Sequence, residues 1–366
     1  MAIGAKTSPR TRYEKKPWRK TPLVESTKLS EAAGCRIFLK LENLQPSGSF
    51  KSRGLGNLVL KAFYSSPTPE KLHIFSSSGG NAGLGAVYAA NFVSRPSTVC
   101  VPMSTKGHMI EKIKDAGATD VIQYGATLHA ADVYLKEVVM PAARERGEVP
   151  VYVNPFDHPD IWEGHASLVD EIGEQMAEIG EDAPEFLVCS VGGGGLFNGI
   201  VEGIERQKGR FEEVGGCAGW ERTKCVCVET EGADSLAQSL ARGENSTLKG
   251  ITSIATSLGV VRVSDRTFDL VREGRKTGKV KNVVLSDAEA AMGCWRLAED
   301  ERILVEAACG VNVALCYGNR LKKALGRPVR PDEKVVIVIC GGSNVSTSIV
   351  ESWKEEYAQV LETTIY

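Results

Sequence analysis

The chain has 366 residues, 42% of them hydrophobic, so it can bury a large core and exceeds the size at which one core usually keeps growing. Its 44 Lys and Arg residues nearly balance 46 Asp and Glu residues, which argues against a nucleic acid or an anionic membrane as partner and favours a small neutral or zwitterionic substrate. No apolar run reaches the roughly 18 residues that a membrane span needs, so no membrane helix is expected.

The ten cysteines lie mostly within apolar runs such as STVCVP and VVIVICGG, which is typical of reduced, buried thiols and not of a disulfide framework. A reducing compartment follows, and we expect the cytoplasm. The first twenty residues contain seven Lys or Arg residues against the single acid Glu14, so a mitochondrial address is the alternative. Pro9 and Pro17 interrupt an amphipathic helix there.

Short β-branched runs alternate with helical patterns, which predicts the α/β class, with parallel sheets covered by helices. A helix is expected to start near Lys51, with an apolar face formed by Leu55, Leu58, Val59, Ala62 and Phe63. The next predicted strands are LHIF, STVCVP, DVIQY and VYV. The helices between these strands have apolar faces that contain Leu84, Val87, Tyr88 and Phe92, then Ile110 and Ile113, then Leu128 and Leu135.

A second series of strands begins with EFLVCSV at residue 185, continues with KCVCVE and ends with EKVVIVIC. Two series predict two sheets and therefore two lobes. We expect a large domain of residues 1–51 and 156–366 and a small mobile domain of residues 52–155, with hinges near Ser52 and near Pro155 to Pro159.

Three glycine-rich turns follow predicted strands: SSSGGNAG, SVGGGGLFNG and VICGGSNVS. Ligands of open α/β sheets bind at the carboxyl ends of strands, where helix N-termini offer free N–H groups. The four glycines of the second turn let the backbone approach an anion, and the turn matches neither the dinucleotide nor the triphosphate motif, so a monophosphate is the predicted guest. A turn needed only for tight strand–helix packing is the alternative.

Lys51, in the segment PSGSFKSRG, precedes the apolar face of its helix. Burial and the positive end of a helix both lower the pKa of an ammonium group and make the amine a nucleophile toward carbonyls, whereas a solvated surface charge is the alternative. Cys340 ends an aliphatic run and is expected at the mouth of the sheet, unless it is a structural thiol. A Schiff-base lysine, a monophosphate cradle and a thiol fit one cofactor, pyridoxal 5′-phosphate.

These segments, with NPFDHPDIWEGHAS, VETEGADS, TSIATSLGV and VEAACG, stand in the order found in fold-type II pyridoxal-phosphate enzymes. The chain most resembles the catabolic L-serine/L-threonine dehydratases, over about Thr21 to Ile349. The resemblance implies a two-lobed, tryptophan synthase β-like fold, a homodimer, and β-elimination of L-serine to pyruvate and ammonia and of L-threonine to 2-oxobutanoate. A serine racemase or β-replacement enzyme, or more remotely a non-catalytic pyridoxal-phosphate binding protein, are the alternatives.

The resemblance also assigns roles to residues. Lys51 would carry the cofactor and remove the substrate α proton, Phe50 would pack on the cofactor ring, and Cys340 would face the pyridine nitrogen. Asn81 would bind the ring hydroxyl. The phosphate would be held by Gly192, Gly193, Gly194, Gly195 and Leu196. The substrate carboxylate would be held by Ser78, Gly79, Gly80 and Asn81. A monovalent cation, potassium, would bind at Gly192, Glu229, Ala233, Leu258 and Val260.

Three further residues stand out within these motifs. Glu163 and His165 in WEGHAS are expected to support the site without taking part in the reaction. Position 79 is Gly, where many liver-type serine dehydratases carry Ala, and the added room beside the substrate leaves the preference between serine and threonine open.

Overall fold

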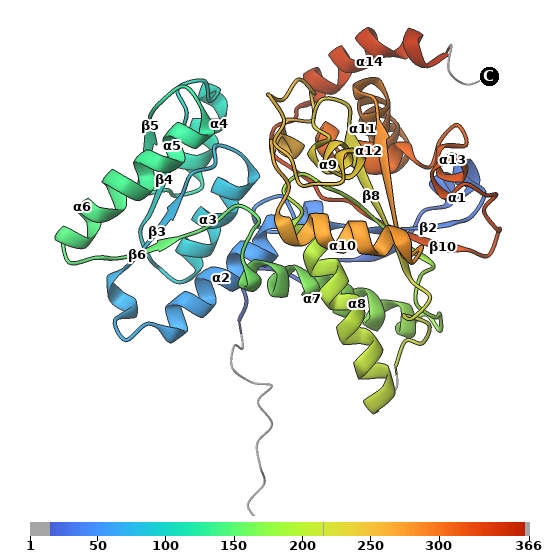
Figure 1. Cartoon of the computed structure of the whole chain (residues 1–366), viewed down its shortest axis with the longest axis horizontal. Helices are drawn as coiled ribbons and strands as arrows, with labels where there is room; N and C mark the ends of the chain where they lie inside the picture. Colours follow the sequence, from blue (N-terminus) through green and yellow to red (C-terminus); the bar gives the residue numbers. More distant parts are fainter. Residues whose placement is uncertain (1–14, 215, 363–366) are drawn as a thin grey trace, which may run out of the picture.

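The computed structural model describes residues 15–214 and 216–362, and its strands form two sheets (Figure 1). The larger sheet has the order β1-β2-β10-β7-β8-β9. Its strands are β1 (Leu23–Glu25), β2 (Arg36–Lys40), β7 (Phe186–Ser190), β8 (Lys224–Thr230), β9 (Val280–Leu285) and β10 (Lys334–Val338). Only the edge pair β1 and β2 is antiparallel among these strands.

The smaller sheet is parallel throughout and has the order β5-β4-β3-β6. Its strands are β3 (Leu72–Ser76), β4 (Ser97–Val101), β5 (Asp120–Gln123) and β6 (Val149–Tyr152). The accompanying helices are α3 (Asn81–Phe92), α4 (Gly107–Asp115), α5 (Leu128–Tyr134), a π-helical segment (Leu135–Val139) and α6 (Met140–Glu145). In Figure 1 this unit lies apart from the larger sheet, with α2 (Lys51–Ser65) and α7 (Pro159–Glu178) between them.

The remaining helices belong with the larger sheet (Figure 1). They are α1 (Thr27–Ala33), α8 (Gly195–Val214), α9 (Ser235–Arg242), α10 (Asp265–Lys276), α11 (Asp287–Glu301), α12 (Ala307–Ala314), α13 (Arg320–Leu325) and α14 (Thr347–Glu362). Short 3-10 turns occur at Glu42–Leu44, Pro69–Lys71 and Thr256–Leu258. No helix in the described ranges is both long and apolar enough to cross a bilayer.

The central strands are uninterrupted apolar runs because helices cover both of their faces. Every residue of β7 and β10 is buried, and the main hydrophobic core surrounds them. All ten cysteines are free and buried, so the prediction of buried thiols is confirmed.

The two-sheet α/β fold and the predicted strands are confirmed, but three strands escaped prediction: β1, β2 and β9. The apolar face predicted for α3 is partly wrong, since Tyr88 and Phe92 are 38% and 40% exposed. Alanines such as Ala86 and Ala90 pack the buried face of α3, so the large side chains are not needed there. The basic residues up to Arg12 and the acid Glu14 lie outside the described residues.

Candidate active site

Lys51 is the first residue of α2, as expected, and the side chain is partly exposed. Its Nζ donates to the backbone carbonyl of Pro155 at 2.5 Å. Surrounding protein atoms desolvate the amine and lower its pKa to about 8, while the nearby Cys340 acts weakly in the opposite direction. Most of the amine still carries its proton at pH 7, but the neutral form, which can attack a carbonyl, is far more abundant than in a solvated lysine.

An ion-pair network holds the start of α2 against the larger sheet. Arg53, fully buried two residues after Lys51, binds both oxygens of Glu42 at 2.7 Å and both oxygens of Glu171 at 2.7 Å. Glu42 follows β2, and Glu171 lies on α7. Buried ion pairs thus tie the helix start that carries Lys51 to the turn after β2 and to α7.

His165 packs behind the lysine. Its ring centroid lies 5.1 Å from that of Phe50, and neither ring nitrogen has a hydrogen-bond partner among the described contacts. Burial lowers the pKa of His165 well below its usual value, with Lys51 and Arg53 adding to the effect, so the ring is neutral. A Cβ at Gly54 would lie 2.5 Å from Nε2 of His165, so the ring packs tightly against the start of α2. This packing fits the supporting role expected for the histidine.

Glu163 lies apart from these groups. Its side chain is 49% exposed and pairs with Lys61. This residue lies on the outer side of the α2–α7 contact and has no link to the Lys51 amine among the described contacts.

The tetraglycine turn joins β7 to α8. A Cβ at Gly193 would lie 2.2 Å from the Phe156 ring, and one at Gly195 would lie 2.5 Å from the Phe156 carbonyl oxygen. Gly194 has φ +90°, and a Cβ there would lie 2.0 Å from Oγ1 of Thr267. Close packing alone therefore requires glycine here. The first N–H groups of α8 have no partners within the helix and point from this turn, so the turn is also suited to an anion.

Cys340 follows β10, next to the end of β7 in the sheet. Its Sγ lies 3.7 Å from Ser190 Oγ and 3.9 Å from Asn312 Nδ2. The neighbouring Cys309 thiol, with help from Ser190, lowers the pKa of Cys340 against the effect of burial. The thiol, the glycine turn and Lys51 thus gather at the carboxyl ends of adjacent parallel strands.

Asn81 begins α3 in the smaller unit but binds groups of the larger one. Its Nδ2 lies 3.1 Å from each carboxylate oxygen of Glu306, and its Oδ1 accepts from the N–H of Ser343 at 2.9 Å. Sequence reasoning missed Glu306, although the motif VEAACG that contains it was part of the resemblance. The sequence signal that could have indicated Glu306 is an acidic residue directly before an apolar helix.

The turn before α3 contains Ser78, Gly79 and Gly80, and hydrogen bonds hold the preceding residue, Ser77, in place. Ser77 Oγ donates to Asp132 at 2.7 Å, and Tyr152 donates to the same oxygen at 2.6 Å. Asp132 was not singled out from the sequence, because a lone acid in an amphipathic helix carries no signal.

The expectation of added room at Gly79 is wrong. A Cβ there would lie 2.9 Å from Cγ2 of Thr105, so a neighbouring side chain already occupies that space.

The five residues expected to hold a cation are partly brought together. Gly192 approaches the backbone of Leu258, and Ala233 bridges to the end of β8 beside Glu229. The Glu229 carboxylate accepts from the N–H groups of Leu236 and Ala237 at 2.9 Å and from Asn282 at 3.0 Å. Burial raises the pKa of Glu229 to about 7.

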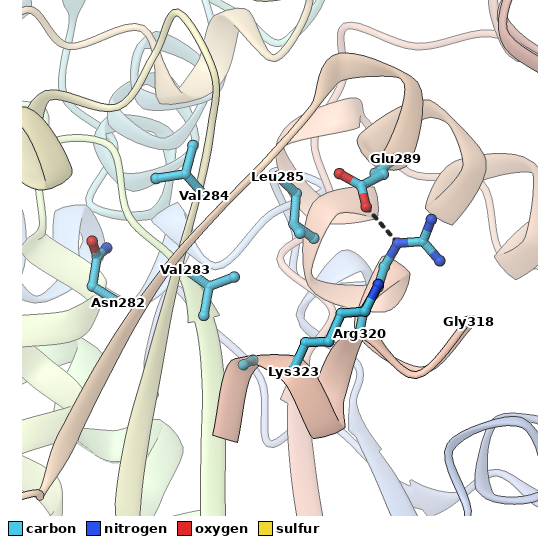
Figure 2. Close-up of a pocket in the computed structure, with 9 residues that line it drawn as sticks. Asn282, Val283, Val284, Leu285, Glu289, Gly318, Arg320 and Lys323 are labelled. Atoms are coloured by element: carbon cyan, nitrogen blue, oxygen red, sulfur yellow. Dashed lines mark hydrogen bonds and ion pairs between the residues drawn. The ribbon is translucent and has the colours of Figure 1, made fainter. Parts of the chain in front are cut away.

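A separate pocket of about 340 Å³ lies along the edge strand β9 (Figure 2). Arg320 reaches across it to Glu289 at 2.6 Å. None of the residues expected to bind cofactor or substrate lines this pocket, so it is distinct from the Lys51 site.

The residues around Lys51 fit pyridoxal phosphate. The site offers an amine with a lowered pKa for the aldehyde, a glycine turn at a helix N-terminus for the phosphate, and a buried thiol for the ring nitrogen. The close packing of Gly193 and Gly195 against residue 156 places that turn next to the carbonyl of Pro155 that binds Lys51.

Known proteins resemble the chain over most of its length. The Saccharomyces cerevisiae protein named catabolic L-serine/threonine dehydratase is 41% identical over 332 residues, 89% of this chain and 88% of that protein. The Bos taurus protein named L-serine dehydratase/L-threonine deaminase is 38% identical over 338 residues, 92% of this chain and 94% of that protein.

Solved structures agree with these relatives. A fungal L-serine ammonia-lyase from Rhizomucor miehei is 29% identical with a TM-score of 0.79, covering 94% of this chain and all of that one. A maize serine racemase, 22% identical with a TM-score of 0.73 over 94% of each chain, shares the fold. The profile of the family described as pyridoxal-phosphate dependent enzyme matches residues 15–341. The chain therefore belongs to the pyridoxal-phosphate dependent enzymes.

Proposed function

We propose that the chain is an L-serine/L-threonine ammonia-lyase, which converts L-serine to pyruvate and ammonia and L-threonine to 2-oxobutanoate and ammonia. The observation that carries this proposal is the Lys51 amine, with its pKa lowered to about 8, next to the tetraglycine turn and Cys340. Relatives named for serine and threonine dehydration, which align over about nine-tenths of the chain, support the choice of substrate.

When bound, the cofactor supplies an aldehyde that captures the substrate amine and a ring that accepts electron density from Cα. Lys51 would hold the cofactor, and its free amine would take the proton from the substrate Cα as general base. Ser78 and the N–H groups at the start of α3 hold the substrate carboxylate. Cys340 would lie at the ring nitrogen, and its thiol, a weaker proton donor than a carboxylic acid, would favour prompt loss of the β-hydroxyl.

The rest of the site follows the same assignment. Phe50 would pack on the ring, and Asn81 would donate to its hydroxyl oxygen. The N–H groups of Gly192, Gly193, Gly194, Gly195 and Leu196 hold the phosphate. Potassium would bind beside this turn at Gly192, Glu229, Ala233, Leu258 and Val260, with Glu229 as the acidic member of the set.

We also propose that residues 1–51 and 156–366 form a large domain and that residues 52–155 form a small domain that moves against it. Separate sheets in the two segments support this division. A homodimer in the cytoplasm completes the proposal, since the resemblance implies the dimer and ten free, buried thiols suit a reducing compartment.

Borohydride reduction of the purified protein with bound cofactor, followed by peptide mass spectrometry, tests the site. The adduct is expected on Lys51, and an adduct on any other lysine would contradict the assignment. Incubation with L-serine and with L-threonine then separates the reactions. Pyruvate and 2-oxobutanoate are the expected products, whereas D-serine as main product would indicate a racemase, and no turnover despite a bound cofactor would indicate a binding protein.

A further inference from the structure

Glu306 is a buried carboxylate at the N-cap of α12, 4% exposed. Three donors surround it: Ser257 Oγ at 2.5 Å, the N–H of Asn344 at 2.6 Å, and Asn81 Nδ2 at 3.1 Å. These groups satisfy a side chain that only accepts hydrogen bonds. The first two belong to the larger unit, whereas Asn81 comes from the smaller one.

The position of the carboxylate is set by a glycine as well as by these donors. Gly342 has φ +116°, and a Cβ there would lie 2.2 Å from Cδ of Glu306. Any side chain at position 342 would therefore displace the carboxylate. The backbone at this point and the Glu306 side chain fit each other only when residue 342 is glycine.

These contacts determine which way the Asn81 amide faces. The N–H of Ser343 can only donate, so the atom facing it must be Oδ1. The Glu306 carboxylate accepts, so the atom facing it must be Nδ2. Rotating the amide by 180° would place oxygen against oxygen and N–H against N–H. Glu306 and Ser343 together thus hold the Asn81 amide in one orientation.

One hydrogen of Nδ2 is directed to Glu306, and the other has a longer contact of 3.3 Å with Ser257 Oγ. We infer that Glu306 is a positioning residue, which keeps the NH₂ group of Asn81 turned toward the ring oxygen of the cofactor so that the second hydrogen can be donated to it. This inference rests on the proposed function, because it takes Asn81 as the ligand of that oxygen. With the amide reversed, Oδ1 would face the ring oxygen and repel it.

Glu306→Gln tests the inference, because a glutamine amide of nearly the same size can present either a donor or an acceptor to Asn81. Cofactor is titrated into apoprotein for the wild type, Glu306→Gln, Asn81→Ala and the double variant. We expect Glu306→Gln to weaken cofactor binding by on the order of ten-fold and to shift the visible absorption band. In the Asn81→Ala background the same substitution should have no further effect, since it acts through Asn81.

Lys112→Met is the matched control. Lys112 lies on α4 in the smaller unit and donates to the Ser343 carbonyl, so its loss removes a contact between the units without touching the Asn81 amide or Glu306. Native affinity and a native absorption band are expected for this variant. A loss of affinity equal to that of Glu306→Gln would mean that the contact between the units matters and not the amide orientation, and would overturn the inference.

Two other results would also overturn the inference: native cofactor affinity and band in Glu306→Gln, or an undiminished effect of that change in the Asn81→Ala background. If Glu306→Gln fails to fold, Gly342→Ala displaces the same carboxylate and should give the same loss of affinity. The borohydride adduct on Lys51 in the wild type keeps the two proposals apart. Its absence refutes the proposed function, whereas its presence with unaffected variants refutes this inference alone.

Discussion

Removing the Arg53 guanidinium should destabilise the protein strongly, because its partner Glu42 is fully buried. In Arg53→Met, Glu42 loses both 2.7 Å contacts and keeps only the neutral donors Thr21 Oγ1 at 2.6 Å and Gln45 Nε2 at 3.1 Å. Glu171 is less affected, since Lys40 still binds it at 2.7 Å. Breaking a buried pair by removing one partner costs about 3–5 kcal/mol, so a loss of that size in the free energy of unfolding is expected.

Arg36→Met provides the comparison. Arg36 also binds two carboxylates, Glu25 at 2.7 Å and Glu181 at 2.5 Å, but its side chain is 31% exposed. Water replaces these partners, so the expected loss is about 1 kcal/mol or less. Urea unfolding of both variants, followed by tryptophan fluorescence and by far-ultraviolet circular dichroism, measures the difference. Equal losses in the two variants would refute the argument that burial of Glu42 makes Arg53 essential.

Three further predictions concern the site. Gly193→Ala should lose most cofactor affinity, because its Cβ would meet the Phe156 ring at 2.2 Å, whereas Gly209→Ala, with nothing within 4 Å, should bind normally. The rate of cofactor capture by the apoprotein, followed by stopped-flow absorbance, should rise with pH and reach half its maximum near pH 8. The reason is that the lowered pKa of Lys51 makes the reactive neutral amine available at lower pH. A midpoint near 10.5 would contradict the desolvation of Lys51. Gly79→Ala should raise KM for L-serine, because the added methyl group crowds Thr105, and adding Thr105→Ala should restore the native KM. A raised KM that persists in the double variant would show that the methyl group added at position 79 acts on the substrate directly.

The strands that sequence patterns predicted are those with continuous apolar runs, such as β7 and β10, because burial on both faces demands such runs. The edge strand β9 was missed because its exposed and half-buried residues weaken that pattern. β2 ends in Lys40, a fully buried lysine whose charge Glu171 neutralises, and a charge next to an apolar run argues against a buried strand until its partner is known.

The same distinction applies to the site. Lys51 and the tetraglycine turn could be predicted because each is local, a residue at a helix start or a turn after a strand. The contacts of Asn81 could not be predicted, since its partners Glu306 and Ser343 lie more than two hundred residues away in the chain. The contact between Gly79 and Thr105 could not be predicted either, because it depends on how a neighbouring loop packs.

The short segment at Pro155 and Phe156 joins β6 of the smaller sheet to α7, and it touches the Lys51 amine at one residue and the glycine turn at the next. Under the proposed assignment, a shift of this single peptide would change the surroundings of the aldehyde end and of the phosphate end of the cofactor together. Lys51 and the glycine turn contact two consecutive residues, so we expect a substitution at Pro155 or Phe156 to disturb both ends of the bound cofactor at once.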